Sequence, residues 1–114
     1  MKRMRGFIYC RVANNQMEAT LEYQKDLLVE LSSLLNIEVV AIAREISNGK
    51  HFYSQSMQQL LLYIRRKEID VVLINDETRI SIFKDLYEEF FMFCQMYEVE
   101  ILTVSDLTML LDEE

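Results

Sequence analysis

Two arginines stand where apolar segments of the chain end. Arg11 closes the first apolar segment, and Arg79 follows the third. A guanidinium group presents a planar fork of N–H donors, so two of them close together suit a phosphate or sulfate anion. The same groups could instead form structural ion pairs with carboxylates, for which the sequence offers Glu45, Asp76 and Glu77. The residue types therefore predict either an anion-binding site or a cluster of ion pairs.

The histidine and the cysteines of the sequence do not form a second candidate site. His51 is the only histidine, and neither a cysteine nor another histidine lies at metal-ligand spacing from it. Cys10 and Cys94 are far apart in the chain and lie inside predicted elements, which is typical of reduced core thiols. Strand alternation also turns Cys10 to the face opposite Arg11. The sequence predicts no metal, no cofactor and no reactive thiol.

The segments that position these residues alternate between strands and helices. Strands are predicted over 6–12, 37–43, 69–74 and 99–104, which are short and rich in β-branched and aromatic residues. Apolar residues at helical spacing predict helices over 16–35, 54–67 and 82–97, and a short last helix starting at Ser105. This alternation predicts an α/β fold in three layers, α/β/α, with a mainly parallel four-stranded sheet.

The predicted topology brings the candidate residues together. Right-handed crossovers place the first and third strands side by side, and ligands of such sheets bind beyond the carboxyl ends of the strands, where the strand order reverses. Arg11 ends the first strand. The third strand is followed by Asn75, Asp76, Thr78 and Arg79. We expect these residues to meet at one edge of the sheet.

Size and charge narrow the function. With 114 residues, 51% of them hydrophobic, residues 1–114 are expected to form one domain. The net charge of -7 has the wrong sign for binding a phosphate backbone, so DNA binding by this chain alone should be weak or absent. No apolar run approaches the roughly 20 residues that cross a bilayer, and the first residues lead into a strand, which favours a cytoplasmic protein without membrane contact.

Several segments resemble, in order, the motifs of one family of DNA-rearranging enzymes. Tyr9-Cys10-Arg11-Val12-Ala13 resembles the Tyr-x-Arg-Val-Ser signature of the serine recombinases, the resolvase and invertase family. Four further likenesses are Thr20-Leu21-Glu22-Tyr23-Gln24, Ile46-Ser47-Asn48-Gly49, Ile69-Asp70-Val71-Val72 and the stretch from Asn75 to Ile82. The resemblance spans about residues 6–103 and implies a resolvase-like catalytic-type domain.

What the resemblance implies for chemistry is a loss. In this family the signature serine attacks a DNA phosphodiester, and a set of arginines offsets the charge of the transferring phosphoryl group. Arg11 and Arg79 match two of those arginines. Ala13 stands at the nucleophile position, however, and Ser54 and Ile82 stand where two further arginines are expected. The resemblance therefore predicts a pseudo-enzyme without a catalytic residue.

The predicted function is that of a catalytically inactive serine-recombinase-like domain that acts as a protein-interaction or regulatory module, linked to DNA recombination or mobile elements. Its partner would be a second copy or another recombinase-type protein. Family members continue into a dimerisation helix and a DNA-binding region, and no DNA-binding domain is expected here. The alternative is a residual recombinase or strand-exchange protein that uses the hydroxyl of Ser47, Ser54 or Ser81.

Two surfaces leave a partner contact open. The predicted helix over 82–97 is apolar around more than half of its circumference, which fits either a core helix or an oligomer interface. The basic triplet over 65–67 lies in the last turn of the preceding helix. There it either complements the helix dipole or contacts a phosphate or a partner.

Overall fold

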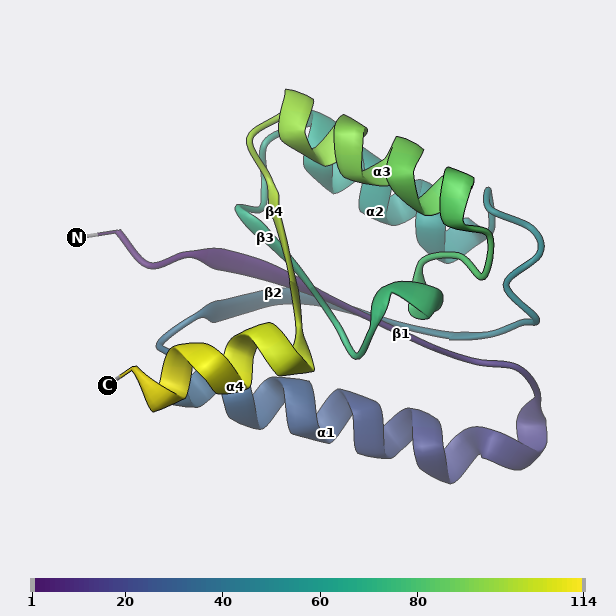
Figure 1. Cartoon of the computed structure of the whole chain (residues 1–114), viewed down its shortest axis with the longest axis horizontal. Helices are drawn as coiled ribbons and strands as arrows, with labels where there is room; N and C mark the ends of the chain where they lie inside the picture. The colour runs from purple at the N-terminus through teal and green to yellow at the C-terminus, as the bar shows by residue number, and fades with distance from the viewer. Residues whose placement is uncertain (1, 114) are drawn as a thin grey trace.

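A computed structural model describes residues 2–113; Met1 and Glu114, the ends of the predicted domain, lie outside the described residues. Strands and helices alternate along the chain (Figure 1). The strands are β1 (Arg5–Val12), β2 (Glu38–Ile46), β3 (Val71–Ile74) and β4 (Glu100–Thr103). The α-helices are α1 (Glu18–Leu34), α2 (Gln55–Arg65), α3 (Lys84–Met96) and α4 (Val104–Asp112). Two short 3-10 turns, η1 (Asn15–Met17) and η2 (Glu77–Arg79), follow β1 and β3.

The sheet has the order β2-β1-β3-β4, and all of its pairings are parallel. The predicted α/β fold is therefore confirmed, as is the adjacency of the first and third strands. Gly6 pairs with Val71, and Tyr9 pairs with Ile74. Because β1 has a neighbour on each side and helices over both faces, every residue from Gly6 to Val12 is buried.

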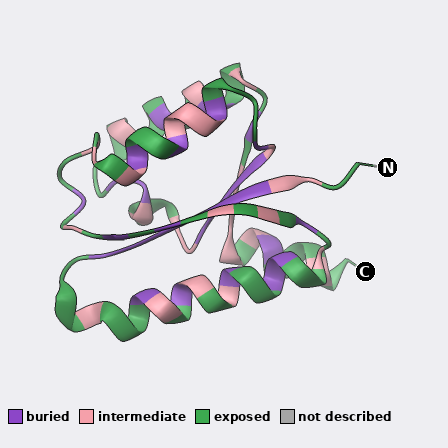
Figure 2. Ribbon diagram, turned by 180° about the vertical axis from the view of Figure 1, so that it is seen from behind, coloured by how far each residue is buried: buried purple, intermediate pink, exposed green. Residues whose placement is uncertain are grey.

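Two pairs of helices cover the two faces of the sheet (Figures 1 and 2). Alternate residues of β1, Ile8 and Cys10 among them, pack into one core cluster with α1 and α4. Phe7 and Tyr9 point the other way, into a second cluster with α2 and α3. Burial raises the pKa of both Cys10 and Cys94 to about 12, which confirms that these cysteines are core thiols. None of the helices in residues 2–113 is long and apolar enough to cross a membrane.

The largest difference from the predicted elements is at the end of β2. The strand was expected to stop at residue 43, but it continues through Arg44, Glu45 and Ile46. Arg44 stays in the strand because it pairs with Glu22 of α1 at 2.6 Å, and Glu45 because hydroxyl groups surround it. Polar residues that find such partners do not end a strand.

Smaller differences lie at helix starts. The chain forms η1 before α1 begins, and Asn14 caps that turn by accepting a hydrogen bond from the Gln16 amide. Helix α3 begins at Lys84 instead of residue 82, because the Ser81 hydroxyl accepts the amide of Phe83 and holds it extended. Thr103 starts α4 through a capping box with Asp106.

An ion pair joins the beginnings of β1 and β3. The Arg5 guanidinium donates from Nε to Asp70 Oδ2 and from Nη2 to Oδ1, both at 3.1 Å, and the Arg5 amide donates to Oδ2 at 2.7 Å. These contacts hold the pKa of Asp70 below its usual value, with the side-chain hydrogen bond to Arg5 as the largest cause. A lowered carboxyl pKa stabilises the fold at neutral pH, and this stabilisation is lost as the pH falls through the folded-state pKa.

We therefore expect Asp70→Asn to lower the free energy of unfolding by about 1 kcal/mol at pH 7, because the pair is partly exposed. The difference from wild type should shrink as the pH falls from about 4 to about 2, where the wild-type carboxyl also becomes neutral. Urea unfolding followed by circular dichroism at several pH values measures both quantities. A difference that stayed constant down to the lowest pH would show that the charge of Asp70 contributes nothing.

Candidate functional site

The side chain of Arg11 lies inside the protein at the carboxyl end of β1. Only 4% of the residue is exposed, and its guanidinium donates hydrogen bonds to backbone carbonyls. Nε donates to the Arg79 carbonyl at 3.2 Å, Nη1 to that of Ser47 at 2.8 Å and Nη2 to that of Thr78 at 2.5 Å. Burial lowers the pKa of Arg11, and the positive charge of Arg79 lowers it further. Arg11 thus ties the loop after β2 and the turn η2 to the end of β1.

Arg79 makes the reciprocal hydrogen bond to the backbone of Arg11. Its Nη1 donates to the Arg11 carbonyl at 3.0 Å, so each arginine holds the backbone of the other; we call this reciprocal pair the arginine clasp. The Nε of Arg79 lies 3.4 Å from Asp76 Oδ2, which is an ion pair without hydrogen-bond geometry. The expected meeting of Arg11 and Arg79 is therefore found. Of the predicted partners, Asp76 pairs with Arg79, whereas Arg11 takes carbonyls and no carboxylate.

Gly49 closes the clasp on the side of the loop after β2. Its φ of +77° lies in the left-handed region, and a Cβ at this position would come within 2.7 Å of Arg11 Cζ. Only glycine combines this backbone conformation with such a close approach. The loop therefore lies directly on the guanidinium and covers it.

A buried carboxylate forms the second part of the site. Glu45, 9% exposed, accepts hydrogen bonds from the hydroxyls of Tyr9 at 3.0 Å, of Ser47 at 2.5 Å and of Ser54. Burial and, next, the negative charge of Glu45 raise the pKa of Tyr9 above its usual value. Glu45 lies beside Arg11 in the sheet register, although the guanidinium is turned to the carbonyls instead. Hydroxyls from one strand, the loop after β2 and a helix start therefore converge on one carboxylate.

Glu45 and Gly49 were not recognised from the sequence in these roles. Glu45 was considered only as an ion-pair partner of an arginine, because the strand that carries it was expected to end two residues earlier. The alternation of Ala41, Ala43 and Glu45 on one face of β2 is the pattern that could have placed its side chain beside Tyr9.

The remaining predicted positions lie around this edge, and of Ala13, Ser54, Ser81 and Ile82 only Ser54 contacts the site residues. Ala13 is exposed directly after β1, where the Ser47 amide donates to the Val12 carbonyl at 2.9 Å. Ser54 caps α2 by accepting the Met57 amide at 3.2 Å, in addition to its bond to Glu45. Ser81 is 4% exposed and Ile82 is 46% exposed, so the chain turns Ser81 inward and Ile82 into solvent.

The hollow at the carboxyl ends of β3 and β4 is acidic. It has a volume of about 450 Å³ and is lined by Asn75, Asp76, Glu77, Thr78, Thr103 and Ser105. Two carboxylates and no cation line it, a charge balance that opposes anion binding. His51 is exposed in the loop after β2, and residues 2–113 contain no group of three or more histidine, cysteine or acidic side chains that could hold a metal ion.

The parallel order of the sheet and the helices on both faces define an α/β domain in three layers, with Arg11 at the end of β1 and Arg79 in the turn after β3. The family model described as "Resolvase, N terminal domain" matches residues 6–113. The chain belongs to the resolvase family.

Solved structures of similar fold include two catalytic domains and a further recombinase. The C-terminal catalytic domain of ISC1926 TnpA, an IS607-like serine recombinase, is 25% identical with a TM-score of 0.84, over 89% of this chain and 70% of that chain. The N-terminal catalytic domain of TP901-1 integrase is 17% identical with a TM-score of 0.80, and the match covers 96% of this chain and 89% of that chain. A resolvase family site-specific recombinase from Streptococcus pneumoniae is 20% identical with a TM-score of 0.76, and the match covers 91% of this chain and 74% of that chain. The integrase domain and the Streptococcus pneumoniae recombinase, at 17% and 20% identity, show only that the fold is shared.

Because Arg11 donates to three carbonyls, replacing it even with another cationic residue should destabilise the fold strongly. Arg11→Lys should lower the free energy of unfolding by about 3 kcal/mol, because one ammonium cannot reach three carbonyls and buried acceptors lose their donors. Chemical denaturation measures this loss. Arg44→Lys, in a half-exposed pair, is the matched control and should cost less than about 1 kcal/mol. Equal costs for the two variants would contradict a structural role for Arg11.

Proposed function

We propose that this resolvase-family domain is catalytically inactive and acts through contacts with other protein molecules. The observation that carries the proposal is Ala13, at the last position of the segment that resembles the family signature. A methyl group has no lone pair and cannot form an ester with a DNA phosphate. If Ala13 occupies the nucleophile position, the covalent route of the family is closed.

The other hydroxyls near this edge are poorly suited to replace the missing one. Those of Ser47 and Ser54 donate to Glu45, whose negative charge repels a phosphodiester. Ser81 is buried and accepts the Phe83 amide. A nucleophile must also lie within about 3.5 Å of the phosphorus and in line with the leaving group, which a hydroxyl on a different loop does not satisfy.

The arginines support the same proposal. The guanidinium N–H groups of Arg11 point at three carbonyls and Gly49 covers them, so an anion would have to displace bonds that hold two loops. We infer that Arg11 and Arg79 hold the fold and do not bind an anion. With Ser54 and Ile82 at the other expected arginine positions, the site has little left to stabilise a phosphoryl transition state.

The similar structures suggest the process in which this domain takes part. An IS607-like serine recombinase and the TP901-1 integrase share this fold, and a domain that keeps the fold without the chemistry can associate with such proteins or with itself. We propose that the chain regulates DNA recombination or a mobile element in this way. Its net charge of -7 favours protein partners over DNA.

One observation favours the alternative of a residual strand-exchange or nicking activity. The Ser47 hydroxyl lies 2.5 Å from Glu45 Oε2, and a carboxylate in that position can take up a proton from an attacking hydroxyl. The Ser54 hydroxyl also donates to Glu45, so Ser47 and Ser54 are the serines to test as substitute nucleophiles.

A plasmid assay separates the two functions. We expect no relaxed product and no covalent protein–DNA adduct when the wild-type chain is incubated with supercoiled plasmid, because no serine is placed for attack. Denaturing gel electrophoresis detects the adduct. An adduct with wild type that disappears in Ser47→Ala or Ser54→Ala would establish the alternative, and Ser105→Ala is the control for loss of a serine elsewhere.

Restoring the hydroxyl alone should not restore activity. Each missing arginine removes a transition-state contact worth roughly 10² to 10³ in rate, so Ala13→Ser should still give no adduct in the same assay. Efficient adduct formation by Ala13→Ser would contradict the proposal that the charge-stabilising groups at Ser54 and Ile82 are also lost.

A further inference from the structure

Four aromatic side chains gather at one hollow, where the loop before α2 meets α2 and α3 (Figure 1). The hollow has a volume of about 210 Å³ and is lined by Phe52, Tyr53, Leu61, Glu89, Phe90 and Phe93. We call it the aromatic hollow. Sites that enclose a whole drug-sized ligand have volumes of roughly 300 to 1,000 Å³, so this smaller hollow suits a single chemical group.

The rings of the aromatic hollow stand at steep angles to one another. The centroids of Phe52 and Tyr53 are 5.0 Å apart with the ring planes at 90°, and those of Phe52 and Phe90 are 6.3 Å apart with the planes at 66°. Phe90 is 1% exposed and Tyr53 is 71% exposed, so the lining extends from the core to the solvent. An aromatic ring has a negative face, and rings that are not coplanar can turn several faces toward one enclosed group.

One acidic side chain completes the lining. Glu89 lies one helical turn before Phe93 on α3, is exposed, and forms no ion pair within residues 2–113. Asp85, a further turn back, adds a second exposed negative charge on the same side of the helix. A carboxylate and aromatic faces both attract a positive charge, so the lining favours a cation.

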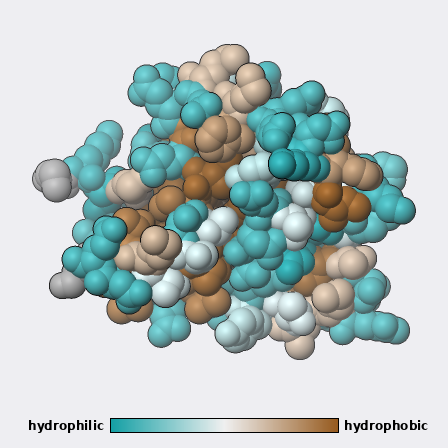
Figure 3. Space-filling model, viewed as in Figure 1, coloured by the Kyte–Doolittle hydropathy of each residue, from teal (hydrophilic) through white to brown (hydrophobic). Residues whose placement is uncertain are grey.

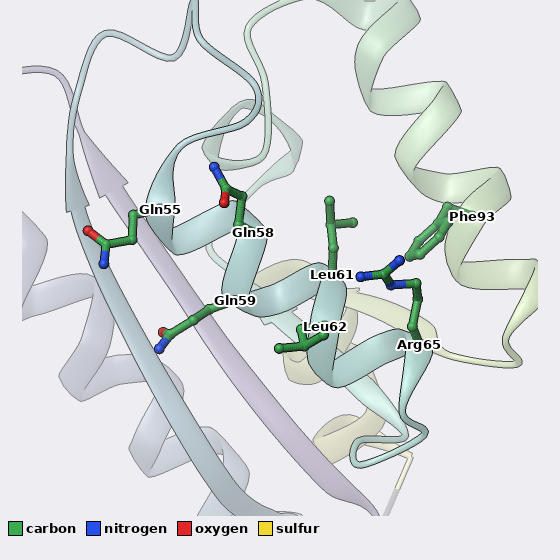
Figure 4. Close-up of a pocket in the computed structure, with 7 residues that line it drawn as sticks. All are labelled: Gln55, Gln58, Gln59, Leu61, Leu62, Arg65 and Phe93. Carbon is green, nitrogen blue, oxygen red and sulfur yellow. The ribbon is translucent and has the colours of Figure 1, made fainter.

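Exposed apolar residues alone would not indicate a ligand. Apolar side chains reach the surface among hydrophilic ones over α3 (Figure 3), and scattered ones are ordinary. The neighbouring hollow is larger, about 510 Å³, but Phe93 is the one aromatic residue among the described residues that line it, and Arg65 is their one charged residue (Figure 4). The combination of four rings with an acid distinguishes the aromatic hollow.

Hydrogen-bonding capacity selects the kind of cation. A primary ammonium has three N–H donors and a guanidinium has five, and burying donors without acceptors is costly. Within residues 2–113, the side-chain acceptors of this lining are the Glu89 carboxylate and the Tyr53 hydroxyl. A quaternary ammonium has methyl groups in place of N–H donors, so it leaves no donor unsatisfied against the rings.

We propose that the aromatic hollow binds a quaternary ammonium group, with the rings around its methyl groups and the Glu89 carboxylate near its positive charge. This inference goes beyond the proposed function, since neither an inactive nor an active recombinase domain requires such a site. The group can belong to a free molecule such as choline or to a trimethylated lysine side chain of a protein. Both sources present the same chemistry to the hollow.

Titration with choline chloride at constant ionic strength, followed by ¹⁵N NMR, provides the test. The amides of Tyr53, Leu61 and Phe93 should shift saturably. The neutral analogue of choline, in which a tert-butyl group replaces the trimethylammonium group, should bind roughly tenfold more weakly because it lacks the charge. A peptide with one trimethylated lysine, compared with its unmodified form, separates the two sources: tighter binding than choline indicates a protein side chain, and weaker binding indicates a free molecule.

Substitutions at the hollow should change the choline affinity in opposite directions. Glu89→Gln should weaken binding roughly threefold by removing the negative charge, and Tyr53→Ala roughly tenfold by removing a ring. Arg65→Gln should tighten binding roughly twofold, because Figure 4 places the Arg65 guanidinium beside Phe93, where it repels a second cation.

Matched controls lie on α1, at the other face of the sheet. Tyr23→Ala removes an exposed tyrosine and Glu30→Gln an exposed acid, and both variants should bind choline like wild type. Three results would overturn the proposal. The first is the absence of a saturable shift with either choline or the trimethylated peptide at tens of millimolar. The second is equal affinity for the neutral analogue, which would show an apolar hollow without preference for a cation. The third is unchanged affinity in both Tyr53→Ala and Glu89→Gln when circular dichroism shows them folded.

Discussion

The reciprocal hydrogen bonding of Arg11 and Arg79 is the constraint on which the site depends. Three segments meet beyond the end of β1: the loop after β2, the turn η2 and the strand itself. Each contributes a carbonyl to one of the two guanidinium groups. Buried carbonyls need donors, and a guanidinium is the side chain that supplies several in one plane. Without the clasp, the loop that carries Gly49 would keep the bond from the Ser47 amide to the Val12 carbonyl but lose its contact with the Arg11 guanidinium.

This use of the arginines fits the proposal that the domain keeps a recombinase fold without recombinase chemistry. The same side chains that the family resemblance assigns to phosphate contacts bind backbone here, and their removal would cost folding stability. Around them, the hydroxyls of Tyr9, Ser47 and Ser54 satisfy Glu45. A buried carboxylate next to the strand ends opposes the approach of DNA, which agrees with the acidic character of the whole chain.

The sequence predicted which residues meet but not how their side chains turn. Parallel topology alone brought Arg11 and Arg79 to one edge, because strand order depends on crossover handedness and not on side-chain detail. Arg11 binds carbonyls and not carboxylates because the backbone of Ser47 and Thr78 lies within reach of its guanidinium. No local sequence pattern predicts that position of the backbone. Glu45 was missed as a centre because its three hydroxyl partners come from separate segments.

The accessibility of the two guanidinium groups tests the account most directly. Arginine Nε–H resonances of Arg11 and Arg79 can be followed by ¹⁵N NMR while phosphate or sulfate is added at constant ionic strength. The account predicts a slowly exchanging Nε–H for Arg11 and no saturable shift of either resonance, because these donors serve the fold. A saturable shift of both resonances with a common dissociation constant would show an open anion site and would contradict it.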